Sequence, residues 1–150
     1  MLQKILVPLD GSKLAEKALP YAEALAEKFA GELILVWALQ AQPAMAMSDY
    51  GAAAYGQIVD QEEAEANKYL HQLQDVLRGR NIRVRIAVIK GASVADAIVD
   101  IARQEKADVI VKTTHGRSGL SRWIYGSVAT KVLQHAPCPI FLVRVSGQDN

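Results

Sequence analysis

The sequence predicts an α/β fold, a five-stranded parallel sheet in the order 3-2-1-4-5 with helices on both faces. Short apolar runs alternate with amphipathic helical patterns, and strands separated by helices pair in parallel through right-handed crossovers. The first, second and fourth runs are apolar on both faces, as buried central strands are. In the third run, apolar residues alternate with Arg83 and Arg85, so one face of this strand meets water. The strand is therefore expected at an edge of the sheet.

The elements follow from these patterns in chain order. Pro20 lies inside the first helical pattern and removes a hydrogen-bond donor, so a kink is expected near Glu16. Gly31 stands where a C-terminal glycine ends that helix. Ser93 and Asp96 form a capping-box pair at the start of the third helix. The expected strands are 4–9, 33–39, 82–89, 108–113 and 139–145, and the expected helices are 12–30, 57–78, 93–106 and 127–135.

The composition limits the classes of function. A length of 150 residues suits a single domain, 1–150. The 17 basic and 16 acidic residues give a net charge of +1 and form no basic stripe, which disfavours nucleic-acid binding. The opening apolar run is too short for a signal segment, no run reaches membrane-spanning length, and the single cysteine, Cys138, suits a reducing compartment. We therefore expect a cytoplasmic protein that binds neither nucleic acid nor membrane.

Two segments fall outside the alternation of strands and helices. Residues 40–56 form a long connection that is rich in Ala and Gly and contains Met45 and Met47. This connection is either a tolerated insertion or a lid or partner surface that uses the two methionines. The tail, 146–150, has nothing to bury and is expected to fray.

The expected strand order brings two chain segments together. The sheet changes its winding direction between the first and fourth strands, and open α/β sheets bind ligands in the crevice at that point, at the carboxyl ends of the strands. Asp10 ends the first strand, and the loop that begins at Thr113 follows the fourth. Asp10 is either a ligand contact in this crevice or a turn and cap residue before Gly11 and Ser12.

The segment after the fourth strand has the pattern of an anion site. A loop that contains Gly116 leads to Gly126, and a helical pattern begins at Ser127. Glycine lets the main chain approach a ligand, and the first-turn N–H groups of Val128 and Ala129 have no partner within the helix. The pattern predicts a phosphate site, in which the Ser127 hydroxyl either binds a phosphate oxygen or caps the helix. The alternative is a glycine turn that caps its own helix and binds nothing.

The same segment resembles the nucleotide signature of the universal stress protein family, G-x2-G-x9-G-[ST]. Gly116, nine intervening residues, Gly126 and Ser127 match its last three elements. The opening KILVPLDGS, the helix GASVADAIVDIA and the closing HAPCPIFLVR also look like that family, so the resemblance covers nearly the whole chain. It implies a Rossmann-like fold that binds ATP, with Mg²⁺ carried by the nucleotide.

Thr113 stands where the signature has its first glycine. A positive φ at this position would cost a β-branched residue about 1–3 kcal/mol, and a close approach would press its methyl group against the ribose or a phosphate. Several other donors remain, so we expect weakened rather than abolished binding. Lys112 is a charge in an otherwise apolar strand, and it either reaches a phosphate and partly offsets this loss or is a solvated strand-end lysine.

The resemblance implies further ligand contacts at matching positions. Pro8, Leu9 and Asp10 would line the crevice, with Asp10 placed for the ribose hydroxyls. Ala38, at the end of the second strand, would border the adenine, and Trp37 alternates away from it into the core. His115 would lie beside the phosphates, although a lone loop histidine is more often structural.

The fifth strand is apolar on both faces although the strand order places it at an edge, so it needs a cover. The resemblance implies that this cover is a second copy, in a homodimer that pairs Ile140 to Val145 about a twofold axis. We expect an ATP-binding stress-response or signalling module with unknown protein partners and at most slow ATP hydrolysis, because no catalytic constellation is visible. The alternative is a family member with lost or weak nucleotide binding that acts as a dimeric interaction module. An adenylating enzyme would need a glycine-rich loop that PLDGSK lacks.

Overall fold

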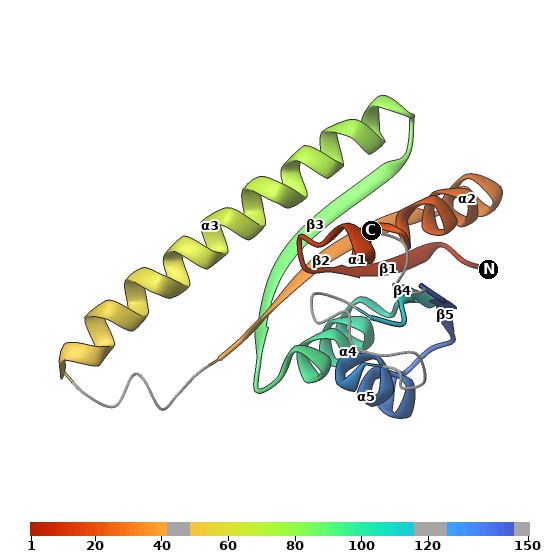
Figure 1. Cartoon of the computed structure of the whole chain (residues 1–150). Helices are drawn as coiled ribbons and strands as arrows, with labels where there is room; N and C mark the ends of the chain where they lie inside the picture. The colour runs from red at the N-terminus through yellow and green to blue at the C-terminus, as the bar shows by residue number, and fades with distance from the viewer. Residues whose placement is uncertain (42–48, 116–125, 146–150) are drawn as a thin grey trace.

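The computed structural model describes residues 1–41, 49–115 and 126–145. The strands are β1 Lys4–Leu9, β2 Glu32–Gln40, β3 Arg83–Gly91, β4 Val109–Thr113 and β5 Ile140–Val143. They form a parallel sheet in the order β3-β2-β1-β4-β5, which confirms the expected fold class (Figure 1). β1 lies at the centre, between β2 and β4, and β3 and β5 are the two edges.

Helices cover both faces of this sheet. They are α1 Lys13–Glu16, α2 Leu19–Phe29, α3 Asp49–Gly79, α4 Val94–Glu105 and α5 Ser127–His135. Helices α1, α2 and α3 share one core with side chains such as Leu35 and Val111, and α4 and α5 share the other with Ile34 and Ile110 (Figure 1). Successive residues of one strand therefore pack into the cores on opposite faces of the sheet, because side chains alternate between the two faces along a strand. Among the described residues, no helix is both long and apolar enough to cross a membrane.

Pro20 divides the first helical stretch into two helices. α1 ends at Glu16, Lys17 and Ala18 form a turn, and α2 begins at Leu19 with Pro20 in its first turn. Proline has no N–H for the carbonyl of Glu16, but it is tolerated in the first turn of a helix. The kink expected near Glu16 is confirmed. The break leaves α1 against β1 and β4 while α2 also covers β2.

α3 begins earlier than the sequence predicts. The expected helix covered 57–78, whereas α3 begins at Asp49 and therefore contains Gly51 and Gly56. Each glycine costs a helix about 1 kcal/mol relative to alanine, but three consecutive alanines between them favour the helical state. The prediction of a long connection over 40–56 is therefore wrong in its second half, which is helical. The two methionines of the suggested lid and the predicted frayed tail lie outside the described residues.

The capping pair predicted at the start of α4 is confirmed. Ser93 Oγ accepts a hydrogen bond from the Asp96 N–H at 3.1 Å and donates to the Asp96 carboxylate at 2.6 Å. The ammonium of Lys131 on α5 donates to the same carboxylate at 2.9 Å. The pair therefore also joins the two helices on this face of the sheet.

Gly31 follows α2, but its role differs from the one that the sequence predicts. The left-handed residue that ends α2 is Ala30, with φ 49°. Gly31 donates its N–H to the Ala26 carbonyl at 2.9 Å, and a Cβ at Gly31 would lie only 2.7 Å from the Leu2 carbonyl oxygen. Glycine is required here because the main chain that leads into β1 passes too close for a side chain.

Gly31→Ala should lower the free energy of unfolding by about 1–3 kcal/mol, because the added methyl group meets main chain rather than a movable side chain. Gly56→Ala is the matched control. Nothing in the described structure lies within 4 Å of a Cβ at Gly56, and alanine favours the helix, so stability should hold or rise by up to about 1 kcal/mol. Urea unfolding followed by circular dichroism measures both, and equal effects at the two positions would contradict the packing argument.

Candidate functional site

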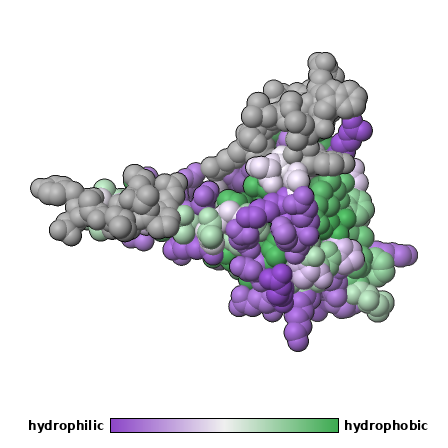
Figure 2. Space-filling view, turned by 90° about the horizontal axis from the view of Figure 1, so that it is seen from below, coloured by the Kyte–Doolittle hydropathy of each residue, from purple (hydrophilic) through white to green (hydrophobic). Residues whose placement is uncertain are grey.

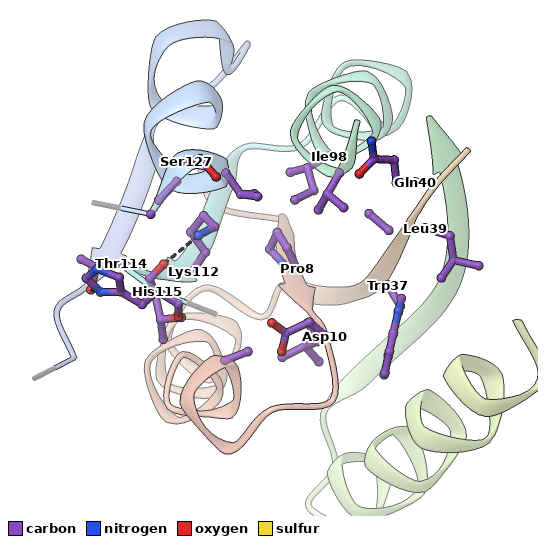
Figure 3. Close-up of a pocket in the computed structure, with 18 of the residues that line it drawn as sticks. Pro8, Asp10, Trp37, Leu39, Gln40, Ile98, Lys112, Thr114, His115 and Ser127 are labelled. Carbon is purple, nitrogen blue, oxygen red and sulfur yellow. Dashed lines mark hydrogen bonds between the residues drawn. The ribbon is translucent and has the colours of Figure 1, made fainter. Parts of the chain in front are cut away.

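A cavity opens at the carboxyl ends of the strands, where the sheet changes its winding direction (Figure 3). Its volume is about 480 Å³, which lies within the range of small-molecule sites. The ends of β1, β2 and β4 form its base, and α1, α3 and the first turns of α4 and α5 form its walls. The crevice expected from the strand order is therefore present.

The cavity brings together residues from distant parts of the sequence. All the expected contact residues that the structure describes line it, while Gly116 lies outside the described residues. Their convergence follows from the strand order, since the parallel strands end at the same edge of the sheet. These lining residues are Pro8, Leu9, Asp10, Ala38, Lys112, Thr113, His115, Gly126, Ser127, Val128 and Ala129.

The cavity also has walls that sequence reasoning missed. Trp37 is buried in the core as expected, with its ring edge-on to Tyr69 at 5.4 Å between centroids, but it lines the cavity as well. Glu62 and Glu65 of α3 also line it. Their spacing places them on one helix face, yet a charged helix face usually meets solvent, so no sequence signal singles them out. The remaining lining residues are Ala15, Leu39, Gln40, Val94, Ile98 and Thr114.

α5 presents its first turn to the cavity. Its N-cap is Gly126, with φ −52° and ψ 151°, and no side chain caps the helix among the described residues. The first intrahelical bond runs from the Thr130 N–H to the Gly126 carbonyl at 2.9 Å. The N–H groups of Val128 and Ala129 precede that bond, and both residues lie in the cavity wall. The partial positive charge of the helix N-terminus therefore faces the cavity.

The structure separates the roles of Gly126 and Ser127. Ser127 is the first helical residue and does not cap α5, so its hydroxyl lies exposed at the cavity. Gly126 has a negative φ, and a Cβ there would lie 3.4 Å from the Thr114 carbonyl oxygen, an ordinary contact. Neither the backbone conformation nor the packing of the described residues requires a glycine at position 126.

Thr113 keeps the extended conformation of β4. The cost of a positive φ considered for this position therefore does not arise. Its Oγ1 donates to the His115 carbonyl at 2.6 Å, and the side chain is buried. Of the two effects expected of Thr113, only crowding of a ligand by its methyl group remains, because Thr113 lines the cavity.

Thr114, which sequence reasoning passed over, joins three parts of the site. Its N–H donates to the Val143 carbonyl at 2.9 Å, and its Oγ1 accepts from the Val145 N–H at 3.3 Å. The same Oγ1 lies 3.1 Å from Nδ1 of His115, in a bond whose direction depends on the imidazole tautomer. The Gly126 N–H donates to the Thr114 carbonyl at 3.1 Å. Thr114 therefore connects the end of β5, the ring of His115 and the start of α5.

Lys112 is buried, with 8% of its surface exposed, so the second of its two alternatives, a solvated strand-end lysine, is wrong. Its Nζ donates to the Thr113 carbonyl at 2.7 Å (Figure 3). Burial lowers the pKa of Lys112 to about 8, and the negative charge of Asp10 opposes that shift in part. Holding the ammonium in this place costs on the order of 3 kcal/mol below pH 8, and the cost disappears at higher pH as the amine loses its proton.

Asp10 serves the turn that leads from β1 into α1. Its Oδ1 accepts from the Ser12 N–H at 2.9 Å, and Ser12 Oγ in turn accepts from the Ala15 N–H at 3.1 Å and caps α1. The Asp10 side chain is half-buried and lines the cavity (Figure 3). The turn role and the place in the crevice therefore coexist in one residue.

The two sides of the cavity differ in chemistry. In Figure 3, Lys112 and Ser127 lie on one side, close to the start of α5, whereas Trp37 and Gln40 lie on the opposite side. Helix α3, which carries the two lining glutamates, borders this second side. Such a cavity suits a molecule with an anionic end and a flat, hydrogen-bonding end. Within the described residues, no group of three or more His, Cys, Asp or Glu side chains is placed to hold a metal ion.

Comparison with known proteins gives matches along the whole chain. Residues 1–144 match the model of the universal stress protein family. Universal stress protein MJ0531 of Methanocaldococcus jannaschii is 28% identical over 145 residues, which cover 96% of this chain and 83% of that protein. The solved structure of MJ0577 from the same organism has a TM-score of 0.81 at 25% identity and covers 97% of this chain and 98% of its own.

A further solved structure is that of a universal stress protein in complex with cAMP. It has a TM-score of 0.63 at 23% identity and covers 97% of this chain and 98% of its own, a likeness that shows the shared fold. The family match spans nearly all residues, and the sheet order agrees with it. The chain therefore belongs to the universal stress protein family.

Proposed function

We propose that the cavity binds an adenine nucleotide, ATP together with the Mg²⁺ that its phosphates carry. One observation carries the proposal: the first turn of α5, which no described side chain caps, opens into a cavity where the sheet changes its winding direction, beside the buried ammonium of Lys112. A hydrogen bond to a charged oxygen contributes roughly 1.5–3 kcal/mol, and the helix dipole adds about 0.3–1 kcal/mol. Several such donors together are enough to hold a phosphate group.

Gly126 supports this assignment. Neither its φ nor its neighbours among the described residues call for a glycine, whereas a phosphate that approaches the main chain would be blocked by a side chain. Gly116 is the proposed second point of close approach in the signature. Ser127 would offer its hydroxyl to a phosphate oxygen, and His115 would lie beside the phosphates.

The opposite side of the cavity suits the nucleoside. Asp10 is the proposed partner of the ribose hydroxyls, with Pro8 and Leu9 beneath it at the end of β1. The main chain at Ala38 would border the adenine, next to the ring of Trp37. A structural relative is a universal stress protein in complex with cAMP, which supports the choice of adenine.

The proposed role is binding rather than turnover. The residues assigned to the phosphates position them, and none is assigned as a general base, so hydrolysis of bound ATP should be slow at most. We propose a cytoplasmic stress-response or signalling module whose state depends on bound nucleotide. The alternative is an interaction module with weak or lost nucleotide binding, and the observation that favours it is the Thr113 methyl group at the cavity.

We further propose that the protein is a homodimer through the edge strand β5. Phe141 on this strand is 40% exposed, and its ring lies 5.5 Å from that of Tyr21, which is 48% exposed. Leu133 of α5 is also exposed, and Figure 2 shows an apolar area on the side of the molecule where α5 and β5 lie. An exposed apolar edge strand is a template for pairing, which a second copy would satisfy.

Isothermal titration with ATP and Mg²⁺ tests the nucleotide proposal, and the wild type should bind one nucleotide per chain. Thr113→Ser keeps the hydroxyl that bonds the His115 carbonyl and removes only the methyl group. Its affinity should therefore rise by roughly fivefold, which corresponds to about 1 kcal/mol of relieved crowding. Thr113→Gly removes both groups and is the second variant. Lack of binding by all three proteins would favour the interaction module.

Gly126→Ser should separate stability from binding. The backbone of Gly126 resembles that of Ser12, which caps α1, so a serine at 126 can bond the first-turn N–H groups itself. Stability should rise by a few tenths of a kcal/mol, because serine is a better N-cap than glycine. ATP affinity should fall at least about tenfold, since the donors are occupied and the approach is blocked. Thermal unfolding and titration measure the two effects, and an unchanged affinity would argue against an anion at this helix.

Phe141→Lys should convert the dimer to a monomer without unfolding the chain, because the side chain is 40% exposed and a charge opposes pairing of the two edges. Val76→Lys is the matched control, since Val76 is 54% exposed on α3, away from β5. Sedimentation equilibrium gives the mass of each protein. A monomeric wild type, or a dimer that persists in Phe141→Lys, would refute pairing through β5.

A further inference from the structure

Lys112 is a buried cation that forms no salt bridge with any described residue. It lies on the interior strand β4 beside the cavity, and its Nζ donates a hydrogen bond to a neutral carbonyl, that of Thr113. Lysine is rarely buried unless it is paired, because taking an ammonium out of water is costly. The cost is tolerated here in a place that the fold could fill with an apolar side chain, as it does at Ile110 on the same strand.

We propose that Lys112 determines the specificity of this site: it makes the cavity select a phosphorylated ligand over an uncharged nucleoside, and it takes up a proton as the phosphate binds. The inference rests on the proposed nucleotide function and adds the charge class of the ligand and its coupling to pH.

The described charged groups around Lys112 do not neutralise its ammonium. Asp10 at the end of β1 favours the ammonium, but burial outweighs it. His115 follows the same strand, and Glu62 and Glu65 face the cavity from α3. On the remaining side, Lys131 of α5 and Asp96 of α4 form a salt bridge with each other at 2.9 Å. A phosphate at the first turn of α5 would therefore be the strongest new negative charge near Lys112.

Proton uptake follows from this arrangement. Burial places the pKa of Lys112 at about 8, so about half of the free protein carries the proton at pH 8. A phosphate nearby favours the charged form and raises that pKa, and the other half of the amines then take up a proton on binding. The phosphate itself has no proton to lose at this pH, because its second pKa is about 6. The sign is therefore net uptake, and affinity should fall as the pH rises above 8.

Titration of the full chain with ATP and Mg²⁺ at pH 8, in two buffers of different ionisation enthalpy, measures this uptake directly. We expect about half a proton taken up per ATP and an affinity about tenfold lower at pH 9.5 than at pH 7. Adenosine should cause no uptake, because it brings no charge to Lys112.

Two variants at the same position separate charge from packing. Lys112→Met keeps the length of the side chain and removes the charge, so ATP affinity should fall about tenfold or more while adenosine affinity holds. Lys112→Arg keeps a charge that does not titrate in this range, so binding should persist at pH 9.5 with no proton uptake. Lys131→Met is the matched control on α5, because Lys131 does not line the cavity. Lys131→Met should retain the uptake at pH 8. His115→Gln, a change at a proposed phosphate contact, tests whether the imidazole is the group that gains the proton.

The outcomes distinguish this inference from the proposal on which it rests. ATP binding without uptake at pH 8, or equal loss of ATP and adenosine affinity in Lys112→Met, would overturn the role of Lys112 and leave the nucleotide site standing. Uptake that disappears in His115→Gln but persists in Lys112→Arg would assign the proton to the imidazole and also overturn it. Failure of ATP to bind the wild type at any pH would overturn both.

Discussion

The chain leaves β1 and β4 toward opposite faces of the sheet, and the site depends on this divergence. After β1 the chain crosses to the face of α1 and α2, whereas after β4 it reaches α5 on the other face. Among the described residues, a cavity lies between the two strand ends, where the winding direction of the sheet changes. The same geometry aims the N-terminus of α5 at that space, beside the buried end of β4.

The sequence predicts those parts of the fold that depend on local chemistry. Pro20 marks the break between α1 and α2, and Ser93 marks the start of α4, because each acts within one turn of its own position. The early start of α3 could not be predicted from local sequence, because Gly51 and Gly56 lower the helix propensity of this segment. Gly31 is a different case. The sequence indicates a glycine at the end of α2, but the reason for glycine there is the close approach of the main chain at Leu2, which is distant in sequence.

In the candidate site, too, the residues that local sequence predicts differ from those whose role depends on tertiary packing. Strand ends and the start of a helix are local features, so Asp10, Gly126 and their neighbours could be named from the sequence. The burial of Lys112 could not, because it depends on the elements that pack around β4 rather than on the strand itself. The lining by Glu62 and Glu65 depends on the direction of α3, and the role of Thr114 depends on its pairing with β5. Residues whose role comes from several elements at once therefore carry little signal in a single sequence.

Thr114 links the edge of the sheet to the start of α5 through hydrogen bonds. It bonds Val143 and Val145 on the side of β5 and Gly126 on the side of α5, within a single residue. A small molecule that shifts the helix start and a neighbour that shifts the strand would act on the same set of hydrogen bonds. By thermodynamic reciprocity, each would then alter the affinity for the other by an equal factor. The degree of self-association through β5 would in that case depend on the concentration of the small molecule, through hydrogen bonds within one domain.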